Sequence, residues 1–182
     1  MVLVDSSHES QNLQFPPEYL KFSGQQNATM KLFQLVSPLG VLRVTKIWSL
    51  LIPEAPLPAD VGAAIWATIY RTTYCEGMNN ETIAIAGMLS QPEGPASLGS
   101  LPLIVLSAND SLTKTPETVI KAMGRDVFAK LVQVAQELQQ ELANLSTQGK
   151  QVIVEDSGHY IQWDQPGMVI DAIREVVGQV RK

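Results

Sequence analysis

The chain has 182 residues, of which 45% are hydrophobic and 17% charged. This length and balance are typical of a globular protein with a core of its own, and they exclude a disordered chain. The 13 basic and 18 acidic residues give a net charge of -5. That charge argues against a nucleic-acid partner, because phosphate binding needs a basic surface.

The first third of the chain alternates apolar and polar stretches. Residues 1–5, MVLVD, form an apolar run that predicts a buried strand and lacks the pattern of a secretory leader. Phe15–Glu18, FPPE, predicts a helix start with prolines in the opening turn, and the polar Gln25–Asn27 predicts a loop. Residues 30–52 are apolar but interrupted by charges, a proline and a glycine, so we expect two short helices and no membrane span.

The middle of the chain favours helices and then returns to a strand. Residues 59–74 carry an apolar stripe typical of a helix, and residues 82–89 predict another short one. Residues 91–100 hold two prolines and two glycines and predict a loop. The continuous Leu, Ile and Val of Leu101–Ser107 then predict a buried strand.

Helix and strand continue to alternate to the end of the chain. Thr115–Glu117 begins a helix that we expect to reach Ser146 before Gly149 ends it. The β-branched run Gln151–Val154 predicts a strand buried on both faces, so the pattern indicates a parallel sheet with crossover helices. The last helix should run from Pro166 to about Val180. We expect it to bury Val169, Ile170, Ile173, Val176, Val177 and Val180.

His159 is one of two histidines and follows the last strand after the break Ser157-Gly158. A lone histidine is usually a surface or hydrogen-bonded structural residue. However, open parallel sheets place their chemistry just beyond the carboxyl ends of their strands, and His159 stands at that point. The position therefore favours a catalytic role.

Three stretches together resemble the C-terminal half of an α/β-hydrolase: LPLIVLSAND at 101–110, SGHYIQWDQP at 157–166, and the amphipathic helix that follows. The resemblance extends over nearly the whole chain from Val2 and is weak between Leu13 and Gly99. It implies an α/β fold, namely the C-terminal portion of an α/β-hydrolase parallel sheet with a helical cap insertion. The implied parts are a core strand with its loop at 1–12, the cap at 13–99 and the C-terminal core at 100–182.

The resemblance implies that His159 is the general base of a Ser–His–acid triad. Two carboxylates are candidates for the acid. Asp110 follows the strand Leu101–Ser107 at the family's commonest acid position, whereas Asp5 ends the preceding strand, where haloalkane-dehalogenase-like members carry theirs. Each could instead cap its own loop. The fixed strand-end position slightly favours Asp5, and only one of the two would hold the imidazole.

The family's nucleophile is a serine on G-x-S-x-G, and the sequence contains no such pentapeptide. The nearest match, PASLG at 95–99, lacks the first glycine and precedes a strand instead of following one. Since the family's order is serine, acid, histidine, the resemblance implies that the serine and the oxyanion-hole loop lie upstream of Met1. We therefore expect the acid–histidine and cap portion of an esterase-like serine hydrolase, inactive alone. The alternative is a non-catalytic fragment, or a remnant that binds a hydrophobic ligand or partner.

The remaining candidates favour structural roles. His8 and Glu9 lack a third ligand at matching spacing, so we expect no metal there and only a place at the pocket entrance. Cys75, the only cysteine, excludes an internal disulfide, fits a reducing cytoplasmic location and is expected to be a buried, idle thiol. Trp48, Trp66 and Trp163 are expected in the core or cap lining. We expect no cofactor, a small hydrophobic substrate under the cap, and self-association through the unpaired edge of the first strand.

Overall fold

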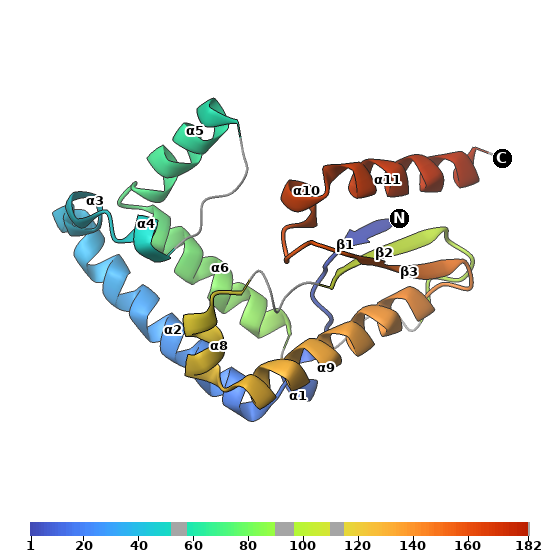
Figure 1. Ribbon diagram of the computed structural model, residues 1–182, viewed down its shortest axis with the longest axis horizontal. Helices are drawn as coiled ribbons and strands as arrows, with labels where there is room; N and C mark the ends of the chain where they lie inside the picture. The colour runs from blue at the N-terminus through green and yellow to red at the C-terminus, as the bar shows by residue number, and fades with distance from the viewer. Residues whose placement is uncertain (52–57, 90–96, 110–114, 182) are drawn as a thin grey trace. The chain divides into compact units, whose positions relative to one another are not determined.

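The computed structural model describes residues 1–51, 58–89, 97–109 and 115–181 (Figure 1). The chain forms two compact units, one of Met1–Leu20 with Leu89–Lys182 and the other of Lys21–Met88. The first unit carries the sheet and the second is helical. The helical unit is shorter at both ends than the predicted insertion at 13–99, because the residues up to Leu20 pack with the sheet unit.

The sheet has three parallel strands in the order β1-β2-β3 (Figure 1). They are β1 (Val2–Val4), β2 (Leu103–Ala108) and β3 (Gly149–Val154). In register, Val4 stands opposite Leu106, and Leu106 stands opposite Val152. The predicted α/β class with a parallel sheet is therefore confirmed at this level. The central strand β2 is buried along its whole length, as expected when helices cover both faces of a parallel sheet.

Alternate side chains of β2 enter two different cores. The even-numbered residues, with Ile104 and Leu106 among them, pack with Ala172 and Val176 of α11 (Pro166–Val180). The odd-numbered residues Leu103 and Val105 pack with Leu142 of α9 (Arg125–Asn144). Figure 1 shows α9 and α11 on opposite faces of the sheet. Each aliphatic side chain buried in this way contributes roughly 1.5–3 kcal/mol relative to exposure.

Two predictions about the elements around β3 need correction. The helix expected from Thr115 to Ser146 is divided at Gly124 into α8 (Glu117–Met123) and α9. Gly124 has a φ of 96°, which a residue without a Cβ adopts at little cost and which ends a helical run. The expectation that β3 is buried on both faces is wrong, since Ile153 is 50% exposed on this edge strand.

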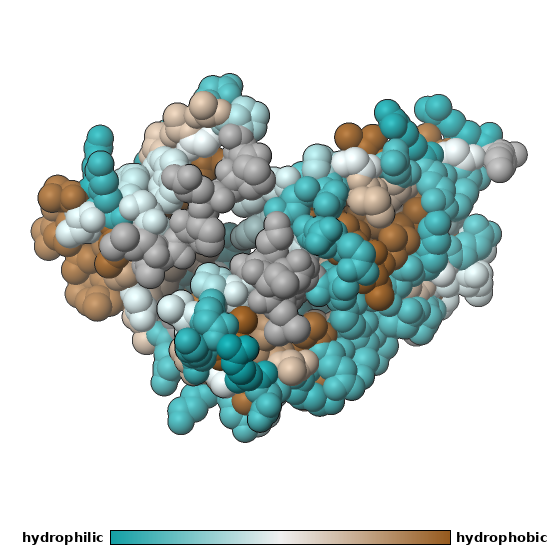
Figure 2. Space-filling model, in the orientation of Figure 1, coloured by the Kyte–Doolittle hydropathy of each residue, from teal (hydrophilic) through white to brown (hydrophobic). Residues whose placement is uncertain are grey.

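The last helix also buries fewer residues than predicted. Val176 is buried and Val169 is partly buried against the sheet. Ile170, Ile173, Val177 and Val180 are instead 40–66% exposed, and we call them the α11 outer stripe. Successive helical residues turn by about 100°, so a helix that is apolar on two neighbouring stripes can direct only one of them at the sheet. Figure 2 shows apolar side chains reaching the surface in the region of α11.

The helical unit begins within α2 (Pro17–Val36), which follows the short helix α1 (Gln11–Gln14). The loop predicted at Gln25–Asn27 is wrong, because α2 passes through it without a break. Glutamine is a good helix former, and a polar stretch without glycine or proline does not interrupt a helix. A 3-10 turn at Ser37–Leu39 leads to α3 (Val41–Thr45) and α4 (Trp48–Leu51).

Two further helices complete the unit. The helix predicted at 59–74 ends earlier, as α5 (Ala59–Ile69), and the one predicted at 82–89 is the second half of α6 (Tyr74–Met88). Trp48 lies at the centre of this unit's core, with Phe33 and Tyr74 edge-on at centroid distances of 5.3 and 5.7 Å. Cys75 is buried beside them, as predicted, and burial raises the pKa of its thiol. No helix in the described ranges is both long and apolar enough to cross a membrane.

Candidate active site

Asp5 directly follows β1 and is fixed to the carboxyl end of β2. Its backbone N–H donates to the Leu106 carbonyl at 2.8 Å, and its Oδ1 accepts from the Ala108 N–H at 3.2 Å. Its φ is 41°, in the left-handed region that aspartate tolerates better than most residues. With its side chain 20% exposed and held by these backbone contacts, the carboxylate has a defined direction.

His159 lies on the turn that leaves β3, at the same edge of the sheet. This turn is ordered by the buried side chain of Ser157 and by the Gly158 N–H, which donates to Oδ2 of Asp164 at 2.9 Å. Asp164 belongs to α10 (Ile161–Asp164), so the turn is closed by the helix that follows it. Nδ1 of His159 lies 2.7 Å from Oδ2 of Asp5.

The two partners are 154 positions apart in the sequence. They meet because parallel strands end at one edge of a sheet, and β1 and β3 both flank β2. An ionised carboxylate can only accept, so His159 donates Nδ1–H to Asp5 and its neutral ring leaves Nε2 unprotonated. The side chain of His159 is 67% exposed, and a neutral Nε2 can take a proton from a hydroxyl or a water.

Asp5 also sets the charge state of the imidazole. The hydrogen bond that His159 donates to Asp5 raises the pKa of His159 above 6.5, partial burial lowers that pKa, and the negative charge of Asp5 raises it again. The net direction is upward, so the imidazolium form is stabilised by its partner. Because most of the ring faces solvent, water screens this attraction.

Tyr160 and Trp163 form an exposed aromatic pair beside the imidazole, the aromatic ledge, which was not predicted. Tyr160 meets the His159 ring at a centroid distance of 5.1 Å, and Trp163 stacks on Tyr160 at 4.4 Å. Tyr160 and Trp163 are 51% and 37% exposed, so the core or cap-lining place expected for Trp163 is wrong. The signal that could have found the ledge is the three-residue spacing of Tyr160 and Trp163, which places both on one side of a helical turn.

The other predicted acid, Asp110, lies outside the described residues. His8 is 7% exposed, its Nδ1 accepts from the Ser10 N–H at 3.1 Å, and its Nε2 lies 3.5 Å from Glu141. His8 therefore anchors the start of α1. Within the described ranges, no three His, Cys, Asp or Glu side chains are grouped so as to hold a metal ion.

Among the described residues, the only side chain hydrogen-bonded to the His159 ring is Asp5, so no described serine hydroxyl is bonded to it. The hydroxyl of Ser97, from the PASLG sequence, accepts from the Gly99 N–H at 2.9 Å and donates to the Leu145 carbonyl at 3.4 Å. The described part of the chain therefore supplies an oriented base without the group that it would deprotonate.

No protein-family model, curated protein or solved structure matches this chain.

Proposed function

We propose that this chain is the acid–histidine portion of a serine hydrolase with the α/β-hydrolase fold, acting on an ester or a related small-molecule bond. The observation that carries the proposal is the 2.7 Å bond between Nδ1 of His159 and Oδ2 of Asp5, at the carboxyl ends of parallel strands. In the sequence, Asp5, Asp110 and His159 follow β1, β2 and β3 respectively. The resemblance implies that these three strands are neighbours, and the order β1-β2-β3 supports the proposal in this respect.

In this proposal His159 is the general base and Asp5 is its orienting acid. A serine hydroxyl donates its proton to Nε2 as its oxygen attacks the substrate carbonyl, and Asp5 stabilises the imidazolium that results. The base must be neutral to accept the proton, so the rate should rise with pH through the raised pKa of His159. The serine comes from outside these 182 residues, since the sequence has no G-x-S-x-G.

The experiment compares the 182-residue chain with a version extended by the in-frame codons upstream of Met1. With p-nitrophenyl esters we expect background hydrolysis from the chain alone and turnover from an extended chain that carries G-x-S-x-G. His159→Ala should then reduce kcat by about 10²–10⁴-fold. Asp171→Asn is the control, because Asp171 is an exposed carboxylate on α11. Turnover by the short chain that survives His159→Ala would contradict the proposal.

A second candidate function is a non-catalytic module that binds a partner or a second copy through an apolar surface. The α11 outer stripe is exposed, and among the described residues β1 pairs only with β2. An unpaired strand edge presents free N–H and C=O groups to another chain. Self-association through the β1 edge is the form of this candidate that the sequence predicts.

Sedimentation velocity over a range of concentrations tests the second candidate. We expect self-association of the unmodified chain that His159→Ala leaves unaffected. A reduction by Ile173→Lys would assign the contact to the α11 outer stripe, and no reduction would assign it to the β1 edge. A monomer at every concentration would contradict it. The hydrolase proposal is decided separately by esterase activity of the extended chain, so the two results are distinguishable.

A further inference from the structure

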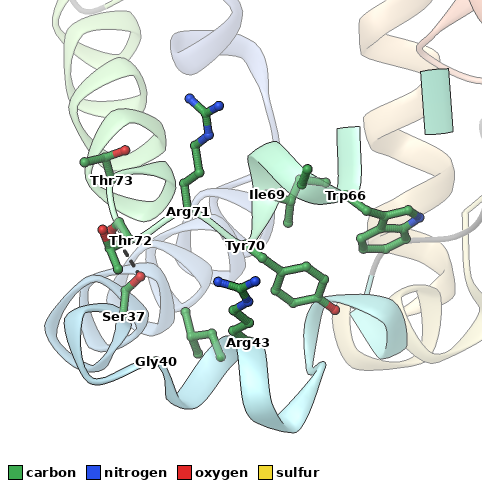
Figure 3. Close-up of a pocket in the computed structure, with 11 residues that line it drawn as sticks. Ser37, Gly40, Arg43, Trp66, Ile69, Tyr70, Arg71, Thr72 and Thr73 are labelled. Atoms are coloured by element: carbon green, nitrogen blue, oxygen red, sulfur yellow. Dashed lines mark hydrogen bonds between the residues drawn. The ribbon is translucent and has the colours of Figure 1, made fainter. Parts of the chain in front are cut away.

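The helical unit contains a cavity of about 600 Å³ (Figure 3). Its walls come from the 3-10 turn at Ser37–Leu39, from α3, from the end of α5 and from the turn that joins α5 to α6. This volume is within the range of about 300–1,000 Å³ that is typical of small-molecule sites. None of its lining residues takes part in the Asp5–His159 pair.

One part of the cavity wall is apolar and aromatic. Leu42 and Ile69 line it and are 6% and 7% exposed. Trp66 and Tyr70 line it too, and their rings stack with centroids 5.9 Å apart and planes inclined by 25°. These four side chains give a ligand an apolar surface against which a ring or a short alkyl chain can pack.

Another part of the wall is cationic. Arg43 of α3 and Arg71 of the α5–α6 turn both line the cavity (Figure 3). Among the described residues neither guanidinium has an ion-pair partner, whereas Arg125 and Arg174 each contact a carboxylate. The turn that carries Arg71 is tied to the 3-10 turn by the Ser37 hydroxyl, which donates to the Thr72 carbonyl at 3.1 Å. This bond holds the backbone next to Arg71 in place.

The charge of the unit is consistent with an anionic ligand. Residues 21–88 contain five basic and four acidic residues, a net charge of +1 in a chain whose total is -5. Arg43 and Arg71 are both exposed, and Figure 3 shows their guanidinium groups directed apart, so each offers an anion a separate cationic contact. The planar guanidinium fork also matches carboxylate and phosphate oxygens, which it can bind in a bidentate way.

We propose that this cavity binds a small organic anion, with a carboxylate or phosphate group at Arg43 or Arg71 and an apolar body against Trp66 and Tyr70. The site goes beyond the proposed hydrolase function and does not depend on it.

Calorimetric titration of the full chain with three probes tests the proposal: naphthoate, naphthyl phosphate and the uncharged naphthol. We expect one or both anions to bind at least about tenfold more tightly than naphthol, and added salt to weaken only the anions. The ratio of the affinities for naphthoate and naphthyl phosphate then distinguishes a carboxylate site from a phosphate site. Equal affinity for anions and naphthol would overturn the proposal.

Variants locate the site. At least one of Arg43→Gln and Arg71→Gln should weaken anion binding by about tenfold or more, and both should leave the affinity for naphthol unchanged. Lys31→Gln is the matched control, because Lys31 is an exposed cation of α2 that does not line the cavity. Trp66→Leu should weaken all three probes, with circular dichroism checking the fold of each variant. Arginine variants that bind the anions as well as the Lys31 control would refute the assignment.

Discussion

Replacing Gly149 by alanine should destabilise the sheet unit strongly, because no space exists there for a side chain. A Cβ at Gly149 would lie 1.8 Å from the Ala143 carbonyl oxygen and 3.0 Å from the Ser146 carbonyl oxygen. Restoring the closest contact to 3.0 Å requires a movement of about 1.2 Å. The obstacle is backbone at the end of α9, and Ala143 is fully buried against β2, so it cannot yield as a flexible side chain would.

We expect Gly149→Ala to lower the free energy of unfolding by roughly 3 kcal/mol, the upper end of the usual cost of overpacking. Gly178→Ala is the control, because Gly178 lies in α11 and a Cβ added there would have nothing within 4 Å. That change should raise the free energy of unfolding by about 0.5–1 kcal/mol, the advantage of alanine over glycine in a helix. Urea unfolding followed by circular dichroism at one protein concentration measures both. A Gly149→Ala protein as stable as the unmodified chain would refute the reasoning.

Three other outcomes follow from the site and the core. In an NMR titration, Asp5→Asn should lower the pKa of His159 toward 6.5, whereas Asp171→Asn should leave it unchanged; an unaltered pKa in Asp5→Asn would mean that the contact is absent in solution. Because the pKa of His159 is raised, the pair stabilises the fold fully below pH 6.5, and this contribution is lost as pH rises through the folded pKa. The difference in melting temperature between the unmodified chain and Asp5→Asn should therefore narrow toward alkaline pH. Cys75 is fully buried with a raised pKa, so a thiol reagent should modify it only after urea unfolding, and rapid modification of the native chain would contradict that burial.

The sequence was sufficient to predict a parallel sheet and to place His159 at its carboxyl edge, with Asp5 and Asp110 as alternative partners. The residues after parallel strands gather at one edge, so both carboxylates were candidates. Only the structure brings a particular carboxylate to His159, since the choice of Asp5 depends on its contacts with β2. The burial of α11 could not be predicted either. Its apolar residues cover two neighbouring stripes, and periodicity identifies a helix without saying which stripe a neighbour covers.

Two further differences between prediction and structure have local causes. The polarity of Gln25–Asn27 favours a loop, although neither glycine nor proline interrupts the stretch, and polarity alone does not end a helix. At Gly124 the apolar pattern continues on both sides, and the positive φ that divides α8 from α9 leaves no mark in that pattern. The aromatic ledge of Tyr160 and Trp163 shows a third limit, since residue type predicts burial for aromatic side chains that the structure leaves exposed.

The order of the strands along the chain has a consequence for how the protein folds. Leu103 of β2 and Gly149 of β3 pair across 46 residues, whereas Val2 of β1 and Ile104 of β2 pair across 102. Closing the longer loop costs more chain entropy and is repaid by a strand of only three residues. We therefore expect β2, α9 and β3 to assemble first and β1 to dock last. The bond between Asp5 and His159 can form only at that final step, so its appearance would report that folding of the sheet is complete.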